Sequence, residues 1–311
     1  MLQLSLMNHL PVFPDFVQID VSHKQSLRAI ADNLPPYSDF NFVSMFTWDI
    51  DDSLELTTLN ENMVVRFGDY SSGESFLSLL GTNDVVDTID TLFDYCRQHG
   101  LKPELKLVGE AVIDSLSDED RMSYIIEEDR DNHDYILSAV NMSDLAKLHP
   151  KKRTKHNRFL TEYGDKSMSK ELDLGLESTT QEIRQLMAEW KLARGRDDSD
   201  TVREFTAINR CLDYASDLDV LGYGIYVDDK LVAFTLFEII NGDSAMLHFG
   251  KADISLKGSN EYLQHHLAKH LKGLGVEHMN NEQDLGIEGL RKSKQSSLPV
   301  HFLKKYTITV A

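Results

Sequence analysis

The sequence predicts a mixed α/β protein, with helices packed on mixed sheets, built from two copies of one unit. Strand-like and helix-like segments recur in the same order in both halves of the chain. A length of 311 residues is enough for two domains, each with its own core. A composition of 41% hydrophobic and 27% charged residues is typical of globular proteins.

The second half shows this order most clearly. Apolar β-rich runs predict a hairpin at residues 223–239, joined at Asp228-Asp229-Lys230, and then a third strand, SAMLHFGKAD. Leucines at helical spacing predict a helix over residues 260–272, and Gly273 ends it. The remaining elements are a strand in VEHMNNE, a short helix in LGIEGLRKSK and a last strand in YTITV.

The first half repeats the order with weaker patterns. We expect three strands in FTWDI, NMVVRF and SFLSLL, followed by a helix over residues 84–97. A strand in ELKLVG, a short helix in AVIDSL and a closing strand in SYIIEED complete the unit. The boundary should lie near EEDRDNHD. The predicted domains are therefore an N-terminal one over residues 1–130 and a C-terminal one over residues 131–311.

Charge is distributed unevenly along the chain. Residues 1–130 carry 8 Lys+Arg and 24 Asp+Glu, a net charge of −16, whereas residues 131–311 carry 24 and 27, a net charge of −3. So negative a surface repels nucleic acid and anionic membranes unless a local basic patch overrides it. We expect no DNA partner, and any anion site should lie in the second half.

Cysteine usage and the N-terminal segment bear on the compartment. Cys96 and Cys211 each fall in an apolar helical pattern, which predicts buried thiols rather than a disulfide or a metal site. The segment MLQLSLM has no basic region and is too short for a signal peptide or a membrane span. These features predict a cytoplasmic protein without integral membrane association. They leave its oligomeric state open.

A basic run and a glycine loop are the candidate anion-binding features. The run KLHPKKRTKHNRFL predicts a helix over residues 151–163 that follows Pro150 and turns Phe159, Leu160 and Tyr163 toward the core. Lys257, Gly258 and Ser259 precede another helix, where free backbone N–H groups favour anions, and the first half has only GTN in that place. A solvated basic face and an ordinary capped loop are the alternative interpretations.

The stretch NNEQDLGIEGLRKSK, residues 280–294, combines acids, bases and glycines. As a surface helix, Asp284 is its N-cap, and Glu288 pairs with Arg291 or Lys292. That interpretation leaves Gly286 and Gly289 unexplained, since each costs a helix about 1 kcal/mol relative to alanine. Close approach of a ligand or another backbone would account for both glycines.

Metal binding is not expected from the histidines. His266 and His270 are four residues apart on a helix, but the sequence offers neither a metalloprotease glutamate beside them nor a third ligand. We predict no metal site and no tightly bound cofactor.

Four segments carry a resemblance to a known family: YSDFNFVSMFTW at 37–48, DLAKLHPKKRTKHNRF at 144–159, KADISLKGSNEYLQHHLAKHL at 251–271 and NNEQDLGIEGLRKSKQSSLPVHFLKKY at 280–306. Together they resemble, in the same order, the soluble bacterial proteins grouped with the phosphatidylglycerol lysyltransferase C-terminal domain. The resemblance implies two GNAT-like acyltransferase folds in tandem. It also implies kinship with enzymes that move an aminoacyl group from aminoacyl-tRNA to an amine or hydroxyl.

The resemblance also implies site residues. The family's basic helix corresponds to Lys152, Arg153, Asn157 and Arg158, its D-L-G turn to Asp284, Leu285 and Gly286, and the pattern of its soluble members includes Glu282, Gln283, Glu288 and Arg291. The chain lacks the transmembrane half of the membrane-bound lysyltransferases and reads IEGL after the turn, so a lipid acceptor is not carried over.

Two functions remain open at this point. The first is an acyl- or aminoacyltransferase with acyl-CoA or aminoacyl-tRNA as donor. Its candidate catalytic residues are Glu282, Asp284, Glu288 and Arg291, and its candidate donor-binding residues are Lys152, Arg153, Asn157, Arg158, Lys251, Lys257, Gly258 and Ser259. The second is a catalytically inactive tandem fold that binds a ligand or a protein, since fold alone does not establish activity.

Overall fold

The computed structural model describes residues 10–68, 74–195 and 198–311. The chain divides into two compact units: unit 1 comprises Met1–Asp134 and Leu303–Ala311, and unit 2 comprises Tyr135–Phe302. The N-terminal segment MLQLSLM lies outside the described residues.

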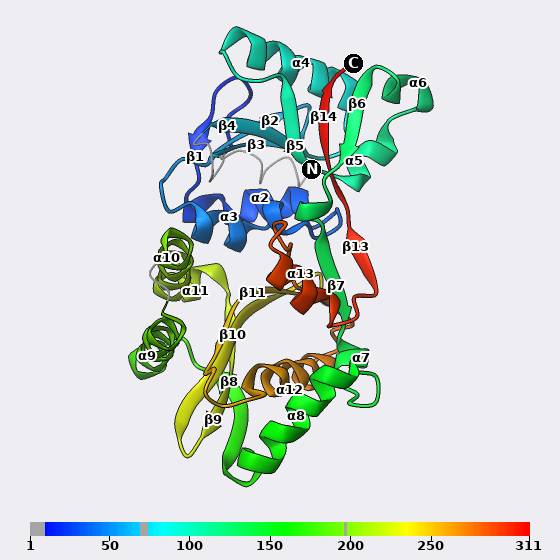
Figure 1. Ribbon diagram of the computed structural model, residues 1–311. Coiled ribbons are helices and arrows are strands. Elements are labelled where there is room, and N and C mark those ends of the chain that lie inside the picture. Colours follow the sequence, from blue (N-terminus) through cyan, green and yellow to red (C-terminus); the bar gives the residue numbers. More distant parts are fainter. Residues whose placement is uncertain (1–9, 69–73, 196–197) are drawn as a thin grey trace. The chain divides into compact units, whose positions relative to one another are not determined.

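Unit 1 contains a seven-stranded mixed sheet with strand order β1-β2-β3-β4-β5-β14-β6 (Figure 1). Its strands are β1 (Val17–Gln18), β2 (Glu55–Leu59), β3 (Asn62–Gly68), β4 (Ser75–Leu80), β5 (Glu104–Gly109), β6 (Tyr124–Glu128) and β14 (Lys305–Val310). Its helices are η2 (Val21–His23), α2 (Lys24–Ala31), η3 (Ser38–Phe40), α3 (Phe42–Trp48), α4 (Val85–Gln98), α5 (Glu110–Ser115), α6 (Asp118–Arg121) and η4 (Arg130–Asn132).

Unit 2 contains a second seven-stranded mixed sheet, of order β13-β7-β12-β11-β10-β9-β8. Its strands are β7 (Asp134–Ser138), β8 (Ser167–Leu172), β9 (Leu221–Val227), β10 (Lys230–Ile240), β11 (Ser244–Ala252), β12 (His278–Asn280) and β13 (His301–Leu303). Its helices are α7 (Ala139–Met142), α8 (Pro150–Tyr163), η5 (Gly164–Lys166), α9 (Glu177–Arg194), α10 (Ser199–Asp213), α11 (Ala215–Leu218), α12 (Ser259–Gly273) and α13 (Glu288–Gln295).

The repeated order of elements is confirmed. In each unit a two-residue turn joins two antiparallel strands, Asn60-Glu61 between β2 and β3 and Asp228-Asp229 between β9 and β10, and all four turn residues have positive φ. Such values are typical of the type I′ turns that suit twisted hairpins. A third antiparallel strand follows in each unit, then a helix, α4 or α12, and a strand parallel to the third, β5 or β12.

The last strand of the chain is not where its position in the sequence predicted. We expected YTITV to close the C-terminal domain, but β14 pairs with β5 and β6 in unit 1. The equivalent place in the unit 2 sheet, next to β12, is taken by β7, which follows the first half directly. Unit 1 thus contains a strand from the C-terminal end of the chain, whereas every strand of the unit 2 sheet lies between Asp134 and Leu303. The predicted division into residues 1–130 and 131–311 does not include this return of the chain to unit 1.

The prediction of a strand in FTWDI was wrong, because this run belongs to helix α3. The side chain of Asn41 caps the helix by accepting the Ser44 N–H at 3.0 Å, and the Thr47 hydroxyl donates to the Val43 carbonyl. Nearly every residue of α3 is buried, so no polar face revealed its helical period. The first strand of the hairpin is instead β2, which the sequence analysis missed.

The core of unit 2 lies between α12 and the sheet. Leu263, Leu267 and Leu271 of α12 pack with Ile225 of β9 and Phe237 of β10. Nearly every residue of β9 and β10 is buried, so both faces of this part of the sheet are covered.

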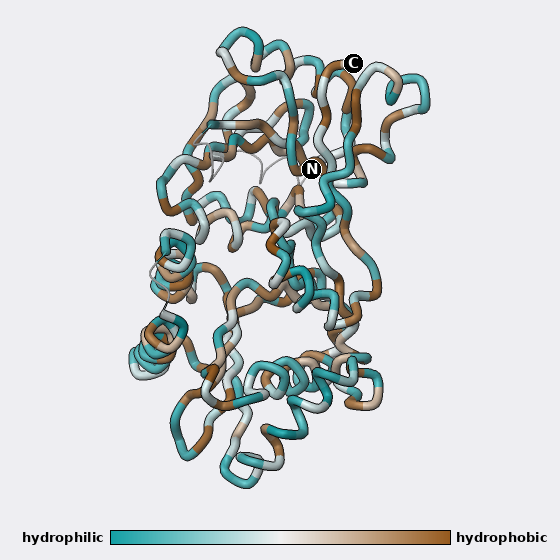
Figure 2. The backbone as a smooth tube through the Cα atoms, in the orientation of Figure 1, coloured by the Kyte–Doolittle hydropathy of each residue, from teal (hydrophilic) through white to brown (hydrophobic). Residues whose placement is uncertain are grey.

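Helix α8 is polar along much of its length (Figure 2). Pro150 begins it and Phe159 is buried in the core, as predicted, whereas Leu160 is largely exposed, contrary to our expectation. The predicted burial of Cys96 and Cys211 as free thiols is confirmed.

Candidate active site

A β-bulge in unit 2 places a histidine among carboxylates. Along β10 and β11 the register steps from Leu236 opposite Phe249 to Phe237 opposite Leu247, so His248 is the extra residue. Bulges re-aim side chains and occur often beside active sites.

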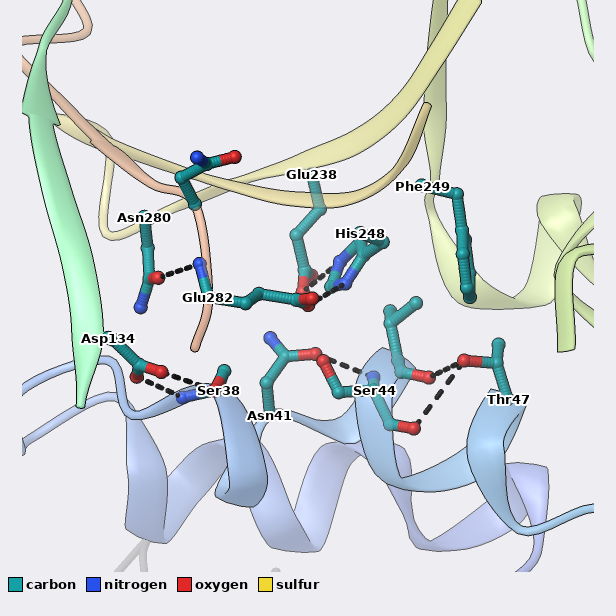
Figure 3. Close-up of polar contacts among 12 residues, drawn as sticks. Ser38, Asn41, Ser44, Thr47, Asp134, Glu238, His248, Phe249, Asn280 and Glu282 are labelled. Atoms are coloured by element: carbon teal, nitrogen blue, oxygen red, sulfur yellow. Dashed lines mark hydrogen bonds and ion pairs between the residues drawn. The ribbon is translucent and has the colours of Figure 1, made fainter. Parts of the chain in front are cut away.

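His248 lies between two glutamates (Figure 3). Its Nε2 is 3.2 Å from Oε1 of Glu238, and its Nδ1 is 3.5 Å from Oε1 of Glu282. Glu238 and His248 are buried, whereas the Glu282 side chain is 18% exposed and is the least buried of the three. Burial alone lowers the pKa of His248, but the two carboxylates outweigh it and raise the pKa to about 9. A pKa of about 9 favours the imidazolium form of His248 at neutral pH, and a positive charge there faces the carboxyl group of Glu282.

The loop after β12 fixes the position of Glu282. Strand β11 pairs with β12 only from Ser244 to Met246, so the loop leaves the sheet beside the middle of β11. Glu282 has a φ of 54° and donates its N–H to the Asn280 side chain at 2.7 Å. A left-handed conformation is costly for a glutamate, and such strain is common where a side chain must be held in one direction.

Asp284 is the buried anchor of the same loop. Its carboxylate, 0% exposed, accepts hydrogen bonds from the Tyr135 hydroxyl at 2.5 Å, from Arg291 Nε at 2.9 Å and Nη2 at 2.7 Å, and from the Gly286 N–H at 2.9 Å. Burial raises the pKa of Asp284, but these hydrogen bonds and the charge of Arg291 more than compensate and lower it to about 2. A carboxylate with this many partners is suited to positioning the loop.

Two details of the predicted helix need correction. Helix α13 begins at Glu288 with Ile287 as its N-cap residue, so Asp284 does not cap it. Gly286 precedes the helix and has a φ of 70°, which explains glycine there. A Cβ added to Gly289 would meet nothing within 4 Å, so the expected close approach is not seen. Glu288 is exposed and pairs with Lys292 one turn on, as the surface-helix interpretation predicted.

The Asp284 network predicts how the stability of unit 2 depends on pH. The folded-state pKa of about 2 lies below the ordinary value of 3.8, so the carboxylate stabilises the fold above about pH 4 and loses this effect as the pH falls toward 2. The difference corresponds to about 2 kcal/mol. We expect Asp284→Asn to lower the free energy of unfolding by about that amount at neutral pH.

The measurement is urea unfolding followed by the fluorescence of Trp190, in a Trp48→Phe background, which makes Trp190 the single tryptophan. The difference in free energy of unfolding between wild type and Asp284→Asn should become smaller in acid. If this difference stays constant down to about pH 2.5, ionisation of the Asp284 carboxylate is not the cause of the lost stability.

The four basic-helix candidates have different environments in α8. Lys152 is 5% exposed, and its Nζ donates to Gln264 at 2.9 Å and to Ser297 at 2.7 Å. Burial lowers the pKa of Lys152 to about 8. Arg158 is exposed and pairs with Glu162 of the same helix, Asn157 is exposed, and Arg153 is half-buried. Lys152 thus connects α8 to α12 and to the segment after α13.

The candidates around the glycine loop have mainly local partners. Lys251 pairs with Glu204 and lies over the Trp190 ring. Lys257 is exposed and donates to the Ile254 carbonyl, and Ser259 donates its hydroxyl to the Asp253 carbonyl.

Gly258 has a φ of 96°, and a Cβ there would lie 2.1 Å from the Lys155 carbonyl oxygen. Helix α8 therefore packs directly on the residue that precedes α12, which requires glycine at this position.

The structure places Glu282 and Asp284 in one loop and pairs Asp284 with Arg291 of α13, and it adds residues that the sequence analysis missed. These are Glu238, His248, Tyr135 and Asn280. A signal for two of them was present, because Glu238 and His248 each interrupt an apolar strand, and a buried charge usually requires a partner.

The two mixed sheets, each with a helix between its third strand and the parallel strand that follows, define the class of this protein. It is a tandem GNAT-like α/β protein, as predicted. Fold class alone leaves the chemistry of the site open.

The chain belongs to the family described as phosphatidylglycerol lysyltransferase, C-terminal, whose model matches residues 32–309. The resemblance inferred from four segments is thereby confirmed over nearly the whole chain. Among curated proteins, none is significantly similar to it. In the described part of the chain, no helix is long and apolar enough to cross a membrane.

Solved structures match along almost their whole length. A conserved protein of unknown function from Bacteroides thetaiotaomicron is 25% identical, with a TM-score of 0.83 over 95% of this chain and 99% of that one. The C-terminal domain of a proposed lysylphosphatidylglycerol synthetase from Agrobacterium fabrum is 12% identical, with a TM-score of 0.62 over 93% and 90%. A tandem GNAT protein from the clavulanic acid biosynthesis pathway is 10% identical, with a TM-score of 0.45 over 94% and 97%.

Proposed function

We propose that unit 2 transfers an activated acyl or aminoacyl group to an amine or hydroxyl, with Glu282 as the carboxylate that handles the proton. The observation that carries this proposal is the chain Glu238–His248–Glu282, which ends in a partly exposed carboxylate. Buried ionisable groups that converge on one exposed acid are typical of a site that moves protons. Membership of the family supports acyltransferase-type chemistry.

The proposed reaction needs little beyond positioning and one proton acceptor. The lone pair of the acceptor nitrogen or oxygen forms the new bond to the donor carbonyl carbon, and the bond to the leaving oxygen or sulfur breaks. The proton released by the nucleophile passes to Glu282 and can then move to the leaving group, so the step balances. His248 pairs with Glu282, and Asp284 with Arg291 holds the loop.

The donor is proposed to be an activated ester or thioester that carries phosphate. Candidate phosphate contacts are Arg153 and Arg158 of α8 and Lys257 of the glycine loop, whose charges lie in the less acidic half of the chain. A small thioester such as acyl-CoA needs only a local basic site. A tRNA presents a long polyanion, which the −16 charge of residues 1–130 disfavours.

Binding measurements distinguish the donors. We expect an acyl-CoA panel to raise the melting temperature, because a ligand that binds only the folded state stabilises it. We also expect weak tRNA retention on filters at about 50 mM salt that disappears at about 200 mM salt. Tight, salt-sensitive tRNA retention without a thioester shift would assign an aminoacyl-tRNA donor. The absence of both a melting-temperature shift and tRNA retention would overturn the transferase proposal in favour of an inactive binding module.

A further inference from the structure

Three histidines meet between two helices of unit 2, away from the Glu282 loop in sequence. His156 of α8 lies 4.8 Å from His265 and 6.4 Å from His266 of α12, measured between ring centroids, and the last two are 5.5 Å apart. The Tyr262 ring contacts His156 and His266 at 5.2 and 4.2 Å. We call His156, His265 and His266 the histidine cluster. No group of three His, Cys, Asp or Glu side chains in the described residues is arranged to hold a metal ion.

Hydrogen bonds determine where a proton could be added. The Nδ1 of His265 lies 3.0 Å from the Met142 carbonyl oxygen, and the Nδ1 of His156 lies 3.2 Å from the Asn157 side-chain oxygen. Because these oxygens can only accept, both Nδ1 atoms carry the proton of the neutral ring. A second proton must therefore go to Nε2. In His156 that atom is buried and has no hydrogen-bond partner among the described residues.

The third ring has a weaker partner. The Nδ1 of His266 lies 3.3 Å from the Ser169 hydroxyl oxygen of β8, which can donate or accept. Each protonated ring of the histidine cluster would face its neighbours as a like charge at short range.

The charged groups on the surrounding elements do not offset this. Lys269 of α12 disfavours protonation of all three rings, whereas Asp144, which follows α7, favours it for His265 only. The other charged or titratable groups on these elements are Lys151, Lys152, Arg153, Lys155, Arg158 and Glu162 of α8, Glu261, His270 and Lys272 of α12, and Lys170 and Glu171 of β8. Of these, Glu261 pairs with Lys155 and Glu171 with His270.

We propose that the histidine cluster makes the contact between α8 and α12 sensitive to acid, so that α8 separates from α12 when the cluster takes up protons. Burial and like charges support the direction of this effect, since they lower the pKa of all three rings, that of His266 to about 4. A histidine whose folded-state pKa is lowered destabilises the folded arrangement as the pH falls below the ordinary value of 6.5.

The location gives this sensitivity a consequence. Helix α8 carries Arg153 and Arg158, and its Lys155 carbonyl packs on Gly258, which precedes α12. Separation of the helices would thus remove the packing of α8 on the loop that contains Gly258. The acid response does not depend on the proposed transferase activity, because it is a property of the helix contact itself.

Hydrogen exchange of peptides from α8 and α12 tests the proposal. We expect protection, corrected for the intrinsic exchange rate, to fall about tenfold between about pH 7.5 and about pH 5.5, as a lowering of the His266 pKa from 6.5 to about 4 requires. Elements of unit 1 measured in the same samples serve as an internal reference.

Variants that cannot titrate separate the cluster from general acid effects. The triple variant His156→Phe, His265→Asn and His266→Asn keeps a ring against Tyr262 and an amide donor toward the Met142 carbonyl, and it should show a nearly flat response. His266→Asn alone should already weaken the response, which covers the case in which the triple variant does not fold. His99→Asn, an exposed histidine of unit 1, should respond like wild type. The proposal would be overturned if protection of α8 and α12 in the wild type did not change with pH. It would also be overturned if protection fell as much in the triple variant as in the wild type.

Discussion

Replacing Glu282 with glutamine should lower the rate of acyl transfer by about 100-fold or more. Glutamine keeps the size of the side chain but cannot take the proton of the nucleophile, while the rest of the loop remains anchored by Asp284 and Arg291. Positioned general bases contribute about 10²–10⁴-fold to catalysis. Because Asp284 and Arg291 hold the loop without the Glu282 carboxylate, the loss should fall mainly on kcat.

The measurement is turnover with the donor identified by binding, at saturating acceptor. Glu189→Gln is the matched control, since this glutamate of unit 2 forms a surface ion pair with Lys230 on α9 and β10. It should retain wild-type turnover. Equal rates for wild type and Glu282→Gln would remove Glu282 from the mechanism. Binding of the donor would be unaffected by that outcome, so the two parts of the proposal fail separately.

Replacing Lys305 with methionine should destabilise unit 1 by about 3–5 kcal/mol. Lys305 is fully buried at the start of β14, and its Nζ lies 2.8 Å from Asp134 and also pairs with Asp39. Burial lowers the pKa of Lys305, but these two carboxylates raise it above its usual range. Without the lysine, Asp134 and Asp39 would stay buried without their cation, which costs far more than the ion pair contributes by forming.

Urea unfolding followed by Trp48 fluorescence, in a Trp190→Phe background, reports on unit 1. The adjacent Lys304→Met is the control, because Lys304 is 42% exposed and pairs with Glu110 at the surface, where ion pairs contribute little to stability. Adding Asp134→Asn and Asp39→Asn to Lys305→Met should recover part of the loss. A loss below about 1 kcal/mol in the single variant would show that the charges of this cluster are compensated in some other way.

Much of the fold could be predicted because its information is local. The leucine spacing of α12 and the apolar β-rich runs of β9 to β11 identify helix and strand within one segment. Long-range pairing has no such local signal. Strand β14 has ordinary strand character, and only its partners, β5 and β6, show that it belongs to unit 1.

The candidate site divides in the same way. The loop acids Glu282 and Asp284 and their neighbour Arg291 stand close together in the sequence, so their proximity could be predicted. Their roles could not, because they depend on residues from distant strands. Tyr135 of β7 helps to make Asp284 a buried anchor, and His248 of β11 pairs with Glu282. Glu288 is chemically similar to Glu282, yet it lies on an exposed helix and pairs with Lys292.

By itself the sequence determined the repeated mixed α/β architecture, the asymmetry of charge and the segments that place this chain in its family. The tertiary structure decided which sheet receives the last strand, which acid of the loop pairs with a buried histidine, and which histidines meet between α8 and α12. The physical reason is that helix and strand periods are properties of neighbouring residues, whereas burial and the charge of a partner depend on residues far apart in the chain.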